Sequence, residues 1–316
     1  MGIGEIDLTL SLGGLLAGLM VGLTGMGGAA LVTPMLVLVF GVSPAVAVSS
    51  DVVASAIMKP VGAMVHIRAR TVHWGLVGWL SAGSIPGVLL GTLLFARVLG
   101  SDAASETIRT WIGWVLVIAV AAMLAKVWVG RRASGLRGAR TTLGTDMPVR
   151  PGPTLLLGLV VGVLVGMTSV GSGSLVVTTM LLLYPLLRPS ILVGTDLTQA
   201  VPMLIAGAIA HAGFGEISLA VVASLLLGQI PGVWIGARMS SRYDGQALRW
   251  LLMVILAATA MKLLGLSTLI AGMIAVVGTL VVSVLYVRER LHGQREVATE
   301  HVATSRPIAA ASAEVP

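Results

Sequence analysis

The sequence contains no cysteine, and it is poor in charged and aromatic residues. Without thiols the chain holds no disulfide, no thiolate metal site and no cysteine nucleophile. Only 10% of the 316 residues are charged, whereas about a quarter are charged in a typical soluble domain. The sequence also lacks a HExxH zinc motif and a phosphate-binding P-loop, which argues against a metalloprotease and an ATP-driven pump. We therefore expect neither an enzyme nor a bound metal or cofactor.

Apolar residues dominate what is present. They make up 56% of the chain, and the mean hydropathy is +1.00. Runs of about 20 apolar residues are the length of a membrane-crossing helix, so the composition predicts an all-α polytopic protein in the lipid bilayer. The net charge of +7 lies largely in short loops and the C-terminal tail, which indicates membrane orientation rather than nucleic-acid binding.

The chain contains one unit twice, at an offset of about 145 residues. Residues 22–34 (GLTGMGGAALVTP) match residues 166–178 (GMTSVGSGSLVVT), and the order of later motifs is also kept. The matched pairs that follow are Asp51 and Asp196, His66 and His211, and the two IPGV motifs at 85–88 and 230–233. A long unit repeated in this order indicates duplication of a whole membrane segment.

The duplication predicts the domain organisation. We expect a first transmembrane repeat (1–130), a basic cytoplasmic linker (131–152), a second repeat (153–266), an extra transmembrane helix (267–287) and a disordered cytoplasmic tail (288–316). The last helix of the first repeat is predicted at about residues 107–129. Counting crossings between the basic loops gives the two copies opposite orientations, as in secondary transporters with inverted repeats.

Each copy has a glycine-rich break inside its first apolar run. Non-helical backbone at membrane depth is tolerated only inside protein or beside a wet cavity, and helix N-termini with neutral hydroxyls suit an anion. The alternatives are a substrate site at short or re-entrant helices, or small residues that merely permit close packing. The candidate substrate-binding residues at the breaks are Thr24, Gly25, Gly27, Gly28, Thr168, Ser169, Gly171, Ser172 and Ser174.

The helix that follows the first break carries charge at membrane depth. Asp51, Ser55 and Lys59 are spaced i, i+4 and therefore share one helix face. Buried charges of this kind mark either a transport pathway or a structural ion pair. In the second copy Asp196 is kept and Gln199 is added. We predict that Lys59 and Gln199 contact substrate and that Asp51 or Asp196 carries a coupling ion.

Two histidines and two glycine ridges recur at matched positions. His66 and His211 are candidates for coupling, and their simpler interpretation is helix capping or packing. The ridges at 83, 87, 91 and 228, 232, 236 are typical of close helix contacts. Ser84 and Gln229 lie beside them and are placed to reach a cavity.

These motifs resemble the TauE/SafE family of sulfite exporters and related anion permeases. The resemblance rests on residues 22–34, 66–74 and 83–91 and on their second copies, and it covers about residues 12–239. It implies transport of sulfur-containing anions such as sulfite, sulfoacetate or thiosulfate, coupled to a proton or sodium gradient, in a bacterial inner membrane. The second copy departs from the first at Thr178, which replaces Pro34, and in its serine-rich break.

The sequence thus favours a secondary anion transporter that works by alternating access. A passive channel or facilitator for small anions is one alternative, and a non-transporting membrane assembly subunit is the other. An oligomer is compatible with the sequence.

Overall fold

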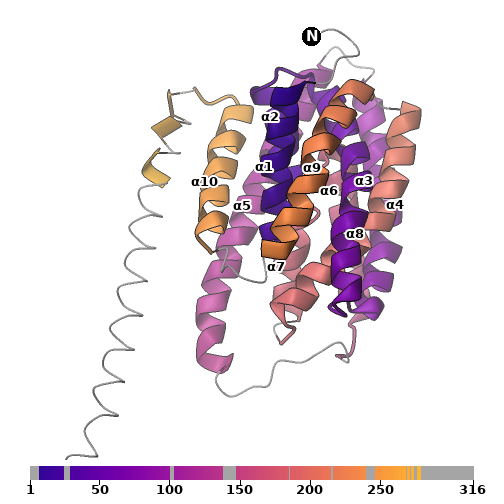
Figure 1. Cartoon of the computed structure of the whole chain (residues 1–316), viewed down its shortest axis with the longest axis vertical. Coiled ribbons are helices and arrows are strands. Elements are labelled where there is room, and N and C mark those ends of the chain that lie inside the picture. The colour runs from indigo at the N-terminus through magenta and orange to yellow at the C-terminus, as the bar shows by residue number, and fades with distance from the viewer. Residues whose placement is uncertain are drawn as a thin grey trace, which may run out of the picture.

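A computed structural model of the chain describes residues 7–24, 29–99, 103–137, 147–184, 186–214, 216–239, 246–267, 269–270, 272–273 and 276–278. Ten helices account for most of them (Figure 1): α1 (Leu8–Thr24), α2 (Ala29–Leu38), α3 (Pro44–Arg68), α4 (Trp74–Leu99), α5 (Ala104–Arg137), α6 (Pro151–Thr168), α7 (Ser174–Leu183), α8 (Pro189–Phe214), α9 (Leu219–Met239) and α10 (Gln246–Leu263).

The predicted all-α membrane class is confirmed. Among the described residues, six helices (α3, α4, α5, α6, α8 and α9) are long and apolar enough to cross a bilayer. Their outer faces carry exposed large apolar side chains, among them Trp79, Leu90 and Ile209, as a surface against lipid requires. The chain is therefore a multi-pass membrane protein.

Local signals set where several helices begin. Pro44 and Pro151 occupy the first turns of α3 and α6, where a missing backbone N–H costs nothing. Ahead of α1, the Asp7 carboxylate accepts hydrogen bonds from the backbone N–H groups of Thr9 (2.8 Å) and Leu10 (3.3 Å). These backbone donors hold the pKa of the Asp7 carboxyl below its usual range.

Helix α5 extends further than its hydropathy pattern suggested. It runs to Arg137 rather than ending near residue 129, so the first residues of the predicted linker are helical. The stretch from 131 to 137 (RRASGLR) consists mostly of good helix formers and holds no proline. Of the predicted helix at 267–287, residues 269–270, 272–273 and 276–278 are described and helical, and the predicted tail at 288–316 lies outside the described residues.

Each of the two glycine ridges joins a helix of one copy to a helix of the other. On α9, a Cβ added at Gly228 or Gly232 would meet the backbone of α1. On α4, a Cβ at Gly83 or Gly87 would meet the backbone of α6. Contacts advance in the same direction along both partners, from Leu155 at Gly83 to Leu159 at Gly87, so each pair is parallel. Missing side chains thus allow backbone-to-backbone packing.

Helices α3 and α8 pack side by side in antiparallel directions and are the most deeply buried of the six membrane-length helices. His66 near the end of α3 lies against Gly194 near the start of α8. His211 near the end of α8 contacts Ser49 near the start of α3. The α3–α8 pair therefore brings the polar face of each copy against the other.

Two matched hydrogen bonds tie the starts of these helices to the opposite copy. The Thr195 hydroxyl of α8 accepts from the His73 backbone N–H at 3.0 Å. The Ser50 hydroxyl of α3 accepts from the Ser218 backbone N–H at 3.1 Å. Both hydroxyls belong to fully buried residues, so each satisfies an N–H that would otherwise lack a partner inside the protein.

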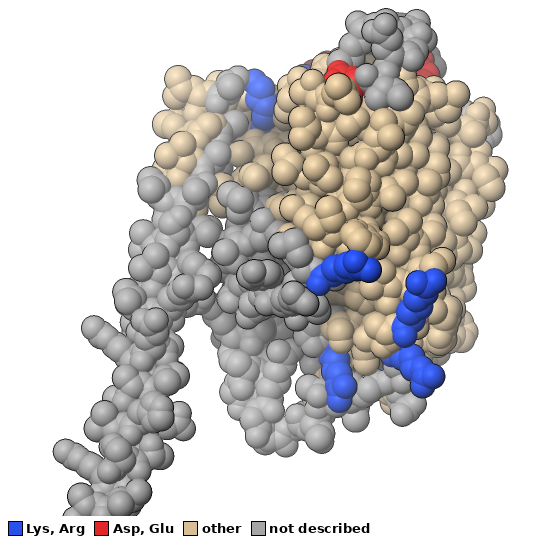
Figure 2. Space-filling model, viewed as in Figure 1, with Lys and Arg blue, Asp and Glu red and all other residues tan. Residues whose placement is uncertain are grey.

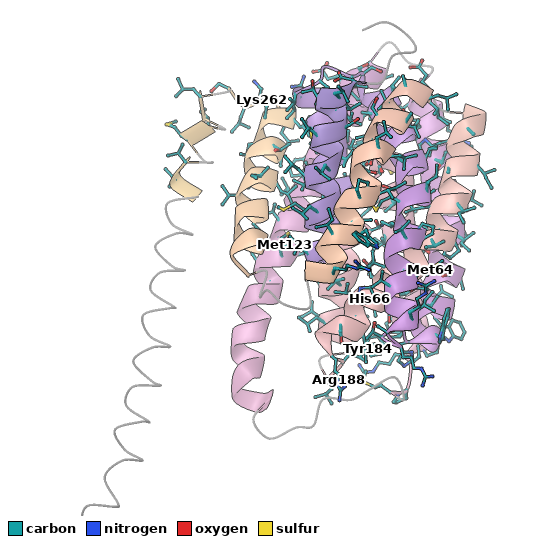
Figure 3. The ribbon with its side chains drawn as sticks, viewed as in Figure 1. Met64, His66, Met123, Tyr184, Arg188 and Lys262 are labelled. Carbon is teal, nitrogen blue, oxygen red and sulfur yellow. The ribbon has the colours of Figure 1, made fainter. Side chains whose placement is uncertain are left out.

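Charge is separated along the long axis of the molecule. Figure 2 shows most basic side chains of this face toward the lower end and the acidic ones at the upper end, where a basic side chain also lies, with an uncharged band between the two ends. Figure 3 places Arg188 at the lower end and Lys262 at the upper end. An uncharged band between two charged rims is the surface expected of a protein that spans a bilayer.

Candidate functional site

The Asp51 carboxylate on α3 is surrounded by hydroxyl groups from three helical regions. Thr33 of α2 donates to Oδ2 at 2.6 Å, and Ser169, just after α6, donates to the same oxygen at 2.9 Å. Ser55, one turn along α3, lies 3.5 Å from Oδ1. All four residues are buried, with at most 1% of their surface exposed. Hydrogen bonds of this kind hold a carboxylate in its ionised form without a direct counter-ion.

The second glycine break positions its serines through an irregular turn. Helix α6 ends at Thr168 and α7 begins at Ser174. Between them Ser169, Gly171 and Gly173 all have positive φ, at 61°, 124° and 136°. Glycine adopts such angles readily, whereas serine rarely does. The Thr168 hydroxyl steadies the turn by accepting a hydrogen bond from the Val170 N–H at 3.2 Å.

Lys59 lies on the same face of α3 as Asp51 and is also fully buried. Its ammonium group donates a hydrogen bond to the Ser172 hydroxyl of the second break. The charges of Asp196 and Asp51 both act on Lys59. The part of the chain that the structure describes holds no direct ion pair between Lys59 and either aspartate. Lysine has three N–H donors, so the group keeps capacity for a further acceptor.

A second buried cluster surrounds Asp196 on α8. The Gln199 side-chain amide donates to Asp196 Oδ1 at 3.3 Å, and the Ser84 hydroxyl of α4 donates to Gln199 Oε1 at 3.3 Å. Asp196 Oδ2 is buried and has no hydrogen-bond partner among the described residues. An ionised carboxylate only accepts and a serine hydroxyl can do either, so Asp196 rather than Ser84 orients the Gln199 amide, and half of the Asp196 carboxyl group is left open.

The two histidines do not meet, because they lie at opposite ends of the antiparallel α3–α8 pair. His211 is fully buried, with Nδ1 3.1 Å from the Ser49 hydroxyl and Nε2 3.0 Å from the Gly166 carbonyl. A neutral imidazole with its proton on Nε2 satisfies both contacts. His66 is half-buried, and its Nδ1 lies 2.9 Å from the Thr71 hydroxyl.

The structure thus brings together Asp51, Ser55, Lys59, Ser169 and Ser172 from α3 and the second break, and it places Asp196 with Gln199 on the facing helix. Thr168 and Gly171 shape the break. Thr24 ends α1 and Ser174 begins α7, and nothing is described of their side chains. The first break, with Gly25, Gly27 and Gly28, lies outside the described residues.

Thr33 and Ser49 are contacts that the sequence analysis missed. Thr33 lies in an apolar stretch, Leu-Val-Thr-Pro. The presence of a polar residue within an apolar run was the one local feature that could have indicated its role. Ser49 is one of two serines directly before Asp51. Of the two polar residues predicted beside the ridges, Ser84 contacts Gln199, whereas Gln229 Oε1 has no partner among the described residues.

A cleft opens at the basic end of the molecule. It has a volume of about 390 Å³ and is lined by Ile67, Arg70, Val72, His73, Trp74 and Gly75. The segment between α3 and α4 forms its wall, and Arg70 has a positive φ of 55° there. This cleft is open to the outside and distinct from the buried clusters on α3 and α8.

Comparison with known proteins gives one family match. The family described as "Sulfite exporter TauE/SafE" matches residues 10–263 of the chain. No solved structure matches the chain.

Several curated proteins of Bacillus subtilis (strain 168) are similar to the chain. "Probable membrane transporter protein YjnA" is 36% identical over 262 residues, which cover 82% of this chain and 100% of that protein. "Probable membrane transporter protein YunE" is 24% identical over 243 residues, covering 72% of this chain and 85% of that protein. These descriptions are those of membrane transporters and not of enzymes.

Proposed function

Because the chain belongs to the TauE/SafE sulfite exporter family, and is thereby a membrane transporter, we propose that it is an ion-coupled secondary transporter of small sulfur-containing anions. Lys59 carries this proposal. It is a buried cation, hydrogen-bonded to Ser172 at the second break. An ammonium group without a direct ion pair is expensive at membrane depth, and an anionic substrate hydrogen-bonded to it would offset part of that cost.

The surroundings of Lys59 suit an oxyanion. The Ser172 hydroxyl at the turn between α6 and α7 accepts from Lys59 and keeps its own O–H to donate, whereas the Ser169 O–H is donated to Asp51. The N-terminus of α7 adds backbone N–H groups and a partial positive charge at the same place. Gln199 and Ser84 offer neutral polar groups from the facing side. Sulfite and organosulfonates present several acceptor oxygens, which match such a set of donors.

We further propose that the two copies are inverted repeats and that transport proceeds by alternating access. The antiparallel α3–α8 pair, the crossed hydrogen bonds of Thr195 and Ser50, and the like packing of α1 on α9 and α4 on α6 all support this arrangement. The basic end of the molecule would face the cytoplasm, in keeping with the positive-inside rule. The basic cleft at Arg70 would then open to the cytoplasm, and the C-terminal tail would lie there.

The proposal is tested by radiolabelled sulfite flux in proteoliposomes, with and without an imposed pH or sodium gradient. Lys59→Met keeps the length of the side chain and removes its charge. We expect at least about tenfold weaker sulfite transport, because a hydrogen bond to a charged group contributes roughly 1.5–3 kcal/mol. Lys262→Met, at the upper end of α10, is the matched control and should transport like the wild type.

Other outcomes separate the alternatives. Flux that only equilibrates, without accumulation under any gradient, would indicate a passive facilitator. Absence of flux for sulfite, sulfoacetate and thiosulfate would overturn the assignment of substrate class and favour a non-transporting assembly subunit. Equal transport by Lys59→Met and wild type would contradict the placement of the site on α3.

A further inference from the structure

The two matched aspartates differ in how completely their oxygens are hydrogen-bonded. Both residues are fully buried. Asp51 has donors on both oxygens, from Thr33, Ser169 and Ser55. Asp196 has one donor, the Gln199 amide on Oδ1, and its Oδ2 has none among the described residues. An ionised carboxylate is therefore well accommodated at Asp51 and poorly accommodated at Asp196.

The matched positions of the two copies in the sequence explain this difference in hydrogen bonding. Each hydroxyl donor to Asp51 has a matched position in the other copy, where a residue without a hydroxyl stands. Thr33 matches Val177, Ser55 matches Ala200, and Ser169 matches Gly25. The carboxylate was kept at both positions while its three donors occur at only one. Two aspartates that occupy equivalent places in the fold are thus suited to different charge states.

The charged groups near Asp196 also favour different charge states for the two aspartates. Helix α3 presents Lys59 and, further along, Asp51, and its half-buried His66 lies beside Gly194. The only charged residue of α4 is Arg97 in its last turn, and α7 contains none. One lysine therefore faces two carboxylates, which leaves one net negative charge if both are ionised. An arriving anion would double that charge in a buried site, which is costly.

We propose that Asp196 carries the coupling proton of the transport cycle, whereas Asp51 stays ionised and positions the break through Ser169. The proposal rests on the proposed anion transport and assigns the coupling step to one residue. A proton adds to Asp196 Oδ2 before or together with the anion at Lys59, and both leave on the other side of the membrane. With a monoanion, one proton and one negative charge move together, so the step is electroneutral and the loaded site has the charge of the empty one.

Infrared spectroscopy tests the proton directly and needs no transport. The wild type, reconstituted in liposomes without substrate, should develop the C=O stretch of a buried protonated carboxyl group as the pH is lowered. This band should be absent in Asp196→Asn and retained in Asp51→Asn, the same change at the matched and equally buried position. Asp196→Glu keeps a carboxyl group and should show the band at a shifted frequency, which guards against loss of the fold in the amide variant.

Proton uptake provides the second measurement. A monoanionic organosulfonate such as methanesulfonate, which exchanges no proton near neutral pH, added to the detergent-solubilised wild type in weakly buffered medium should cause uptake of about one proton per bound anion, by the charge balance above. Asp196→Asn should lose this uptake and should no longer accumulate sulfite under an imposed pH gradient. A band that disappears in Asp51→Asn instead, or persists in Asp196→Asn, would overturn the proposal, as would accumulation driven by sodium alone. Without any sulfite flux in the wild type the proposed function fails, and the infrared band still decides the protonation of Asp196.

Discussion

Replacing glycine by alanine, which adds one methyl group, should have opposite effects on stability at two positions of the same helix. Gly83 and Gly78 both lie on α4, five positions apart. A Cβ at Gly83 would lie 2.8 Å from the Leu159 N of α6 and closer still to the Leu155 carbonyl oxygen. A Cβ at Gly78 would have no atom within 4 Å. We therefore expect Gly83→Ala to destabilise the protein and Gly78→Ala to leave it as stable as the wild type or more so.

The size of the difference follows from the atoms involved. Backbone atoms of α6 cannot move aside as a flexible side chain can, so the methyl group at Gly83 must push the helices apart. Overpacking of this kind costs about 1–3 kcal/mol. Alanine in place of glycine favours the helix itself by up to about 1 kcal/mol, and at Gly78 nothing opposes that gain. Because the propensity gain is common to both variants, they should differ by the overpacking cost alone, roughly 1–3 kcal/mol in the free energy of unfolding.

The assay is equilibrium unfolding in mixed micelles, in which a denaturing detergent is titrated into a mild one and helicity is followed by circular dichroism. The midpoint for Gly83→Ala should fall and that for Gly78→Ala should not. Gly228→Ala on α9, which would meet the Ser11 carbonyl of α1, should behave like Gly83→Ala. Equal midpoints for the two α4 variants would refute the backbone-to-backbone packing of α4 on α6.

Three further predictions concern other parts of the molecule. Thr195→Val should cost about 1–3 kcal/mol of stability, because the buried His73 N–H loses its acceptor; an unchanged unfolding midpoint would contradict that hydrogen bond. Asp7→Ala should lower the melting temperature at neutral pH, where the carboxylate caps α1. The pKa of Asp7 in the folded protein lies below the ordinary value of 3.8, so the stabilisation is complete above pH 3.8 and is lost as the pH falls through the pKa of the folded state. A difference in melting temperature between wild type and variant that persists at still lower pH would argue against the cap. The absence of cysteine permits single-cysteine labelling, in which Gly213→Cys should react with an impermeant maleimide from outside cells and Ala69→Cys only after permeabilisation; the reverse pattern would invert the proposed orientation.

The class of fold, and the residues that share one face of α3, could both be predicted from the sequence. Composition and apolar run lengths predicted an all-α membrane protein, and six described helices meet that description. The i, i+4 spacing of Asp51, Ser55 and Lys59 predicted that they share a face, and all three are buried on α3. Helical periodicity determines such relations because they depend only on residues within two or three turns.

What lies opposite that face could not be derived in the same way. Thr33 and Ser169, the donors to Asp51, are 18 and 118 positions away in the chain, and Ser172 is 113 positions from Lys59. Periodicity along a helix says nothing about which other helix packs against it. The site predictions for the first break stay predictions, and so do the roles assigned to His66 and His211.

The ridge between α1 and α9 also has a consequence for synthesis of the protein. Asp7 N–H, at the start of α1, donates to the Ser224 hydroxyl of α9, which is 217 residues later. At about 5–20 residues per second, α9 is made roughly 10–40 s after α1. Throughout that interval the nascent α1 lies in the membrane without the partner on which it packs in the finished protein, whereas α4 waits only for α5 and the linker before α6 is made. Helix α1 is therefore synthesised long before the helix on which it packs, and a chain that stops before α9 leaves it without that partner.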